Sequence, residues 1–269
     1  MVKVRIFGDE AKTHHSVEMK SAAAQATWAV PEEVPVAFIY NRRNYAVMMA
    51  TPANLSEFAV GFSITERVID HCDDISSIDI HQSDQGIEFH IAIAPKMLER
   101  LDVRQQRRNL VGRAGCGICG LENADVIFAR LPVVAEKRRV LEIQVLEAAL
   151  QDLEKWQPLN DKTKTVHAAA FVSNAGHIHM VREDVGRHNA LDKLLGAIAL
   201  EHINPSDGFV LISSRCSYEI IEKSARMGIQ AVASISGPTA FAIRKAAEAN
   251  IALYCKSGDT FLEVNNLGQ

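Results

Sequence analysis

The sequence lacks any run of about eighteen apolar residues, the length that a membrane-spanning helix requires. Its N-terminal stretch, MVKVRIFGDEAKTHHSVEMK, has no uninterrupted apolar segment and no small-residue cleavage site of the kind found in secretory leaders. We therefore expect no membrane partner and a cytoplasmic location.

An excess of one charge sign is also missing. The 29 Lys and Arg residues stand against 33 Asp and Glu residues, which gives a formal net charge of -4. Without a basic excess, the composition does not favour a nucleic-acid partner. Evidence for binding partners must therefore come from local motifs in the sequence.

Cysteine is scarce, and the five residues are Cys72, Cys116, Cys119, Cys216 and Cys255. An odd and widely spaced set does not fit the disulfide framework of a secreted protein, so it indicates a reducing compartment. The one closely spaced pair then needs a chemical explanation.

The chain is long enough to fold, since 269 residues with 48% hydrophobic content can bury one large core or two smaller ones. In the first half, period-two patterns predict strands at residues 2–7, 34–40, 45–50, 75–81 and 87–94. A helix is expected after Pro52, with Phe58, Phe62, Thr65 and Ile69 at helical spacing. Residues 8–33 show little periodicity.

The patterning fails over residues 96–120. This stretch contains Arg104, Arg107, Arg108 and Arg113 with no acidic residue between them, followed by closely spaced glycines. We expect an exposed, mobile loop here.

Strands and helices alternate over the last hundred residues. Strands are expected at residues 168–173, 178–182, 209–213, 231–235, 251–255 and 261–264, and helices at 143–156, 187–201, 218–227 and 239–249. Pro158 is expected to end the first of these helices, and Gly228 and Asn250 are expected to cap two others in the left-handed conformation. The order predicts an α/β fold, α+β overall, with helices covering a sheet.

Cys116 and Cys119 stand three positions apart among glycines, beside Arg113 and before a possible helix start at Leu121. Positive charge of this kind stabilises a thiolate. Such a pair has three possible roles. It can form half of a zinc site, act as a thioredoxin-like redox dithiol, or carry sulfur. Zinc would need two more ligands, and no second C-x-x-C motif exists. A redox dithiol normally opens a helix directly after a strand.

Sulfur transfer fits the pair best. A persulfide on one cysteine has an electron-poor inner sulfur, which a neighbouring thiolate can attack. That attack releases the terminal sulfur as sulfide and leaves a disulfide. A flexible loop suits a group that must meet a donor and then an acceptor.

A second cluster of ionisable residues lies at residues 181–193, at an expected strand-to-helix junction. Asp184 is expected to cap the helix, while Arg187 and His188 in its first turn would present donors to an anionic ligand. A solvated first turn with internal salt bridges is the simpler interpretation. Two cations at the positive end of a helix dipole favour a bound anion instead.

Three other segments give a less specific indication of function. His167 enters an apolar strand, where a structural hydrogen-bonded role is the more common one. The segment Tyr254, Cys255, Lys256, Ser257, Gly258 and Asp259 leads from a buried strand into a tight turn that fits a phosphate or guanine, or is a bare hairpin turn. Residues 213–217 also join a strand to a helix, and we expect their hydroxyl and amide groups to line the same phosphate or guanine site.

Together, the Cys116–Cys119 motif, the run Glu-Asp-Val-Gly-Arg-His-Asn-Ala-Leu-Asp-Lys at residues 183–193 and Ser217-Tyr218-Glu219 resemble the FdhD/NarQ family of formate dehydrogenase accessory sulfurtransferases. The resemblance extends from residue 33 to residue 264. It implies a homodimeric sulfur carrier that accepts sulfur from a cysteine desulfurase. The acceptor it implies is the bis-guanine-dinucleotide form of the molybdenum cofactor, which then enters formate dehydrogenase.

By the same resemblance, Cys116 and Cys119 would bear the sulfur, and residues 254–259 would belong to the cofactor-binding turn, where a guanine nucleotide would mimic the cofactor. The implied organisation is a β-rich portion with one helix at residues 1–103, the cysteine loop at 104–120 and a cofactor-binding domain at 121–269. That last domain would be a three-layer α/β unit similar to cytidine deaminases. We predict no metal site.

Deamination itself is excluded by sequence. The zinc deaminases need an H-x-E motif and a P-C-x-x-C pair. Here His167 is followed by Ala168 and Ala169, and Gly115 precedes Cys116. The chain also has Thr163-Lys164-Thr165 where the family often carries Thr-Gly-Gly, and Cys216 is an unassigned thiol. The competing hypotheses are a non-catalytic cofactor-binding chaperone and a structural zinc module.

Overall fold

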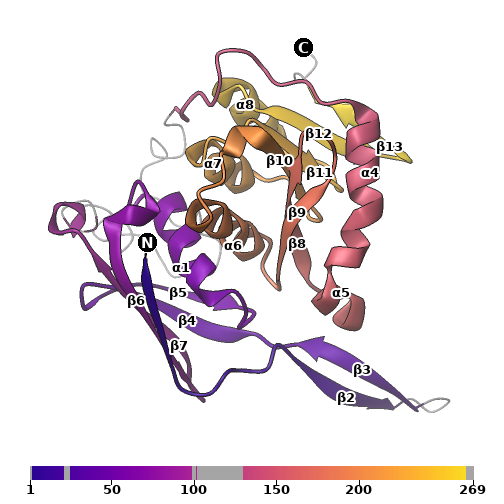
Figure 1. The fold of residues 1–269 in the computed structure, drawn as a ribbon. Coiled ribbons are helices and arrows are strands. Elements are labelled where there is room, and N and C mark those ends of the chain that lie inside the picture. The colour runs from indigo at the N-terminus through magenta and orange to yellow at the C-terminus, as the bar shows by residue number, and fades with distance from the viewer. Residues whose placement is uncertain (1, 21–24, 99–100, 102–129, 265–269) are drawn as a thin grey trace.

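The computed structural model describes residues 2–20, 25–98, 101 and 130–264. The predicted cysteine loop at residues 104–120 lies outside these residues. Within them, the chain forms two sheet-based halves that meet through helices (Figure 1). No described helix combines the length and the apolar character needed to cross a membrane.

The N-terminal half is a five-stranded sheet with one helix packed on it. Its strands are β1 (Lys3–Phe7), β4 (Val34–Tyr40), β5 (Arg43–Ala50), β6 (Ile75–Ser83) and β7 (Gly86–Ile93), in the order β1-β6-β7-β4-β5. Helix α1 (Leu55–Thr65) covers one face, and the short helix η1 (Cys72–Asp74) follows it. The core between sheet and helix is rich in aromatic rings, with Phe38 stacked on Phe62.

The C-terminal half is a six-stranded sheet between two layers of helices. The strands are β8 (His167–Ser173), β9 (Ile178–Asp184), β10 (Gly208–Ile212), β11 (Ala231–Ser234), β12 (Ala252–Ser257) and β13 (Thr260–Glu263), in the order β13-β12-β11-β10-β8-β9. The helices are α4 (Ile143–Leu153), η2 (Glu154–Trp156), α5 (Pro158–Thr163), α6 (Arg187–Leu200), η3 (Pro205–Asp207), α7 (Tyr218–Arg226) and α8 (Ala240–Ala249).

These layers follow from the alternation of side chains along each strand. In β10, Val210 and Ile212 pack with α6, α7 and α8, whereas Phe209 and Leu211 pack with α4. Both faces of the sheet are therefore covered, which confirms the predicted three-layer α/β arrangement.

One expectation from the sequence is wrong. Residues 14–31, which show little periodicity, form a hairpin of β2 (His14–Lys20) and β3 (Gln25–Pro31), with Val17 opposite Trp28. The predicted end of the preceding helix before Pro158 is confirmed, since η2 ends at Trp156, and Pro158 then opens α5, where proline costs no hydrogen bond. The left-handed caps at Gly228 and Asn250 are confirmed.

Helices α1 and α6 join the two halves by direct backbone contact. A Cβ atom on Gly61 would overlap the carbonyl oxygen of Asp192, and one on Gly196 would overlap that of Glu57. Only glycine permits this approach. Beside the crossing, Arg182 of β9 donates two hydrogen bonds of 2.6 and 2.7 Å to the carboxylate of Glu57 in α1.

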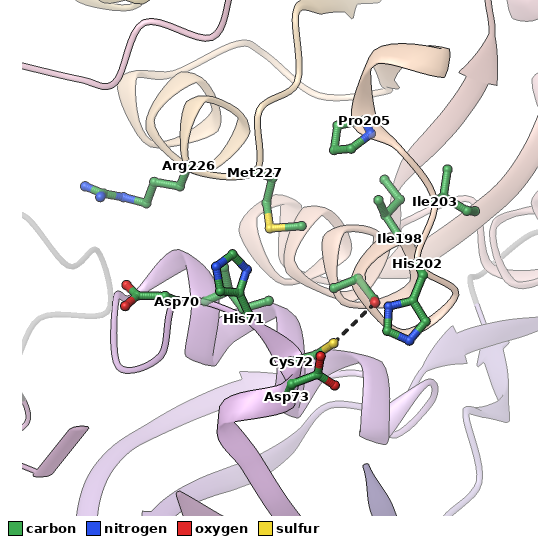
Figure 2. Close-up of a pocket in the computed structure, with 12 residues that line it drawn as sticks. Asp70, His71, Cys72, Asp73, Ile198, His202, Ile203, Pro205, Arg226 and Met227 are labelled. Atoms are coloured by element: carbon green, nitrogen blue, oxygen red, sulfur yellow. Dashed lines mark hydrogen bonds between the residues drawn. The ribbon is translucent and has the colours of Figure 1, made fainter. Parts of the chain in front are cut away.

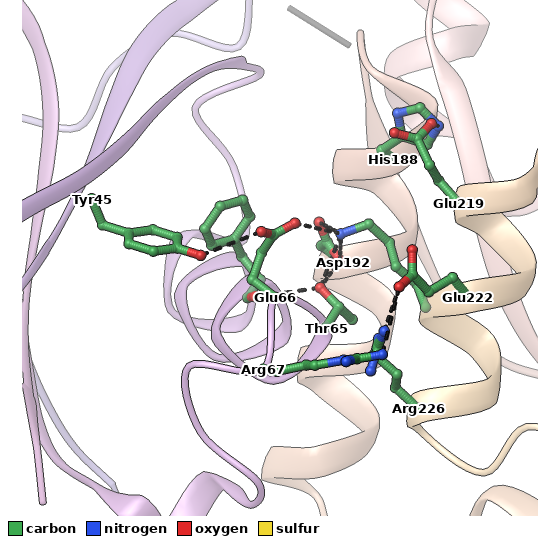
Figure 3. A network of polar contacts seen from close by, with 11 residues as sticks. Tyr45, Thr65, Glu66, Arg67, His188, Asp192, Glu219, Glu222 and Arg226 are labelled. Carbon is green, nitrogen blue, oxygen red and sulfur yellow. Dashed lines mark hydrogen bonds and ion pairs between the residues drawn. The ribbon is translucent and has the colours of Figure 1, made fainter. Parts of the chain in front are cut away.

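Two buried ion pairs fix the same interface, and both use α6. The Nζ of Lys193 lies 2.6 Å from Oδ2 of Asp184, and both side chains are fully buried. The preceding residue, Asp192, accepts hydrogen bonds from Thr65 of α1 and from Lys223 of α7 (Figure 3). Burial acts to lower the pKa of Lys223, but the carboxylates of Asp192 and Glu66 outweigh it and raise the pKa.

Replacing Lys193 with Met tests the first pair. The change leaves the carboxylate of Asp184 buried without its cation, so the free energy of unfolding should fall by about 3–5 kcal/mol. Urea unfolding followed by circular dichroism measures this. The control is Lys155→Met, which breaks an exposed pair with Asp152 and should cost at most about 1 kcal/mol. Equal losses in the two variants would contradict the interpretation.

Candidate functional site

One edge of the C-terminal sheet gathers most of the predicted site. The parallel strands β10, β11 and β12 all end there. Strand β8 begins and β9 ends at the same edge, because His167 pairs with Asp184 and Ile212 pairs with Ala169. Ligands of α/β sheets bind outside the carboxyl ends of the strands. We call this edge the crevice edge.

Asp184 organises the loop that leads into α6. Its Oδ1 accepts hydrogen bonds from Gly186 N (2.8 Å) and from the Asn189 side chain (3.0 Å). Its Oδ2 accepts from Thr51 N at 3.0 Å and pairs with Lys193. The predicted cap is wrong in position, since the N-cap of α6 is Gly186. With the carboxylate fully buried, its position does not support a direct contact with a ligand.

His188 lies in the first turn of α6 and is held from α7. Its Nε2 lies 2.8 Å from a carboxylate oxygen of Glu219 and 3.3 Å from the hydroxyl of Ser217. Burial acts to raise the pKa of Glu219, but the hydrogen bond and charge of His188, with Lys223 and Arg187, outweigh it and lower the pKa. Glu219 is therefore an anion that holds the imidazole in place, and this role was not predicted.

Arg187 and His167 lie near His188 at the same edge. Burial lowers the pKa of His167, and the charges of Arg187 and His188 lower it further, against the opposing charge of Asp184. The Nε atom of Arg187 is buried and has no hydrogen-bond partner within the described residues. A buried guanidinium N–H without a partner is costly, so this position is suited to an anionic ligand.

The loops before α7 and α8 lie side by side at the crevice edge. Cys216 forms a parallel bridge with Pro238, and Thr239 N donates to the Cys216 carbonyl at 3.0 Å. Ser234 donates to the carbonyl of Ser214 at 2.7 Å. Helices α6, α7 and α8 thus all begin at this edge, where their free N–H groups and dipoles favour an anion.

The predicted turn at residues 254–259 divides into two parts. The side chains of Tyr254 and Cys255 are buried, and the Tyr254 hydroxyl accepts a hydrogen bond from Leu141 N. Their positions do not support ligand contacts. Lys256 is half-buried and Ser257, Gly258 and Asp259 are exposed, with Gly258 at φ +60°. By strand spacing, this turn lies about 19 Å along the crevice edge from Asp184.

The sulfur-bearing pair predicted at Cys116 and Cys119 lies outside the described residues. The other three cysteines, Cys72, Cys216 and Cys255, are free and buried. Burial raises the pKa of all three thiols, that of Cys255 to about 12. A protonated, enclosed thiol is a poor nucleophile.

The crevice edge shows no metal centre in the part of the chain that the structure describes. No three His, Cys, Asp or Glu side chains converge there, or elsewhere among these residues, in an arrangement that could hold a metal ion. The site instead combines Arg187, His188 and helix N-termini, which are groups that recognise oxyanions.

Comparison with known proteins gives consistent matches. The family model described as FdhD/NarQ matches residues 31–262. The chain is 46% identical over 224 residues to the sulfur carrier protein FdhD of Xanthomonas euvesicatoria pv. vesicatoria, covering 83% of this chain and 79% of that protein. It is 44% identical over 224 residues to the sulfur carrier protein FdhD of Cupriavidus necator, covering 83% and 77%.

A solved structure shares the fold. It comes from Desulfotalea psychrophila and is described as a formate dehydrogenase accessory protein. The TM-score is 0.68 with 23% sequence identity, over 94% of this chain and 96% of that one. At this identity, the likeness concerns the fold alone.

The burial of three thiols makes a direct prediction. In the native protein at neutral pH, iodoacetamide should leave Cys72, Cys216 and Cys255 unmodified, because they are enclosed and protonated. Labelling followed by peptide mass spectrometry measures this, and labelling in denaturant provides the control. Rapid alkylation of Cys216 or Cys255 without denaturant would contradict the structure.

Proposed function

Because the chain belongs to the FdhD/NarQ family, we propose that it is a sulfur carrier that takes sulfur as a persulfide on Cys116 and Cys119 and passes it to a molybdenum cofactor. The donor in this proposal is a cysteine desulfurase. The acceptor is the bis-guanine-dinucleotide form of the cofactor, which formate dehydrogenase then receives. We also propose that the protein is cytoplasmic and forms a homodimer.

The observation that carries the proposal is the state of the other thiols. Cys72, Cys216 and Cys255 are buried and have raised pKa values, so none offers a thiolate to a partner protein. Sulfur exchange requires a thiolate that a partner can reach. This leaves Cys116 and Cys119 as the candidates for carrying sulfur.

The proposed sulfur transfer through Cys116 and Cys119 is balanced in atoms and electrons. A carrier thiolate attacks the terminal sulfur of the donor's persulfide, and the donor's own thiolate leaves without net oxidation. The second carrier thiolate then attacks the inner sulfur, a disulfide forms, and the terminal sulfur leaves as sulfide. The two electrons that the sulfide gains come from the cysteine pair, and a cellular thiol reductant restores that pair.

The crevice edge supports binding of the acceptor. Arg187 and His188, with the starts of three helices, offer donors for the phosphates of a guanine dinucleotide. The turn from Lys256 to Asp259 lies at the same edge, several strands away. Dinucleotides extend across the carboxyl ends of strands in α/β sheets, so one ligand can reach both places.

The sulfur-carrier proposal predicts where sulfur is found. After incubation with cysteine desulfurase and L-cysteine, mass spectrometry should detect one added sulfur on the peptide that contains Cys116 and Cys119. The double replacement Cys116→Ser with Cys119→Ser should abolish it. The matched control is Cys72→Ser, whose hydroxyl can still donate to the Ala199 carbonyl and should leave loading unchanged.

Two results would count against this proposal. An unmodified mass after incubation would exclude the carrier role. Full support of formate dehydrogenase activity by the double serine variant would instead indicate a non-catalytic chaperone that only holds the cofactor.

The acceptor site is tested with guanosine diphosphate as a mimic of the cofactor. Arg187→Ala removes a charge-assisted donor from the crevice edge, so binding should weaken about tenfold or more, as measured by calorimetry. Lys96→Ala, an exposed cation of the N-terminal half, is the control and should bind normally. Unchanged affinity in Arg187→Ala would remove this residue from the site.

A further inference from the structure

Two arginines at the crevice edge have side chains that make no ion pair or hydrogen bond within the described residues. Arg187 is the first residue of α6, and its Nε atom is buried. Arg215 lies in the loop between β10 and α7, and it is exposed. The same edge of the sheet therefore carries two cations that have no bonded partner in this part of the chain.

The loop that carries Arg215 is fixed on both sides. On one side, Ser213 N donates to the carbonyl of Ala168 at 3.0 Å, and the Ser213 hydroxyl accepts from Ala168 N at 2.8 Å. On the other side, Cys216 forms a parallel bridge with the loop before α8. Ser214 and Cys216 are buried, so the alternation of side chains along the loop turns Arg215 outward. Arg215 is thus held at the crevice edge by the backbone on either side of it.

The same loop is tied to the start of α6. The Ser217 hydroxyl lies 3.3 Å from Nε2 of His188, the residue that follows Arg187. Ser217 and Arg215 are two positions apart, which is about 7 Å of extended chain. The guanidinium groups of Arg187 and Arg215 therefore extend from two segments that lie side by side.

The carboxylates near the start of α6 already have partners. Asp184 pairs with the buried Lys193, and Glu219 pairs with His188 (Figure 3). Neither carboxylate makes an ion pair with Arg187 or Arg215. An anion that binds both arginines therefore has to come from outside the described chain.

The opposite end of α6 has a different arrangement of charge (Figure 2). The hollow between η1 and the ends of α6 and α7 also contains an arginine, Arg226, but this residue is paired with Glu222 of its own helix. Arg182 of β9 is likewise paired, with Glu57 of α1. These arginines stabilise the protein itself, which distinguishes them from Arg187 and Arg215.

From this arrangement we propose that Arg187 and Arg215 form a clamp for two adjacent phosphates of one nucleoside diphosphate group. A planar guanidinium binds a phosphate through two parallel hydrogen bonds, and a diphosphate offers one phosphate to each arginine. Arg187, with its buried Nε, takes the inner phosphate, and the exposed Arg215 takes the second. The assignment of this diphosphate to a guanine dinucleotide rests on the proposed function of the crevice edge.

The clamp is tested by comparing two ligands that differ by one phosphate. Calorimetry measures the binding of guanosine diphosphate and guanosine monophosphate to the full chain. The variants are Arg215→Ala and Arg215→Lys. The control is Arg42→Asn, which removes an exposed arginine from the turn between β4 and β5, where φ of +68° suits asparagine.

We expect Arg215→Ala to weaken binding of the diphosphate about tenfold or more, because a charge-assisted contact to the second phosphate is lost. Binding of the monophosphate, which lacks that phosphate, should change by less than about twofold. Arg215→Lys should show a smaller loss for the diphosphate, since an ammonium group keeps the charge but not the planar fork. The control should bind both ligands normally.

A loss in Arg215→Ala that is confined to the diphosphate supports the clamp. Unchanged affinity for the diphosphate, an equal loss for both ligands, or a wild-type chain that does not bind the diphosphate overturns it. Sulfur loading is measured on the same proteins by mass spectrometry. Normal loading without the diphosphate-specific loss removes the clamp alone, whereas a wild-type chain that takes no sulfur contradicts the sulfur-carrier function and leaves the clamp to be decided by the binding data.

Discussion

The arrangement of the whole molecule depends on two consecutive buried charges in α6. Asp192 pairs with Lys223 of α7 and accepts from Thr65 of α1, while Lys193 pairs with Asp184 at the end of β9. Removing charges from water is expensive, and an apolar interface would be equally stable or more so. What the pairs provide is a single relative placement of the two halves, because a shift along α6 would leave a charge buried without its partner. The glycine contact between α1 and α6 adds to this restriction by requiring close backbone approach.

The same buried ion pairs also fix the geometry of the crevice edge. Asp184 neutralises Lys193 and also binds the backbone of Gly186 and the side chain of Asn189, so the first turn of α6 cannot move independently. Arg187 and His188 are therefore held at the positive end of a helix dipole, where a cation is unfavourable by itself. Glu219 compensates for His188. The Nε of Arg187 has no hydrogen-bond partner among the described residues, and an anionic ligand would supply one.

The sequence predicts the N-terminal sheet and most helices because each of them buries one face, which leaves a periodic pattern. It predicts the central C-terminal strands because they are short apolar runs that are buried on both faces. It does not predict the hairpin of β2 and β3, whose apolar residues, including Val17 and Trp28, stay partly exposed and leave only a weak pattern. The charged run at residues 183–193 predicts a ligand site, and within it Asp184 pairs with the buried Lys193. This pairing is not evident from the sequence, because the partners of Asp184 include Thr51, more than a hundred positions away, and no local spacing reveals such a contact. Glu219 was missed for the same reason, since its partner His188 belongs to another helix.

A carrier of reactive sulfur faces a problem of selectivity that burial can solve. Any accessible thiolate can exchange with a persulfide, so additional reactive cysteines would divert the cargo. Burial keeps the thiols of Cys72, Cys216 and Cys255 protonated and enclosed, which removes them from this competition.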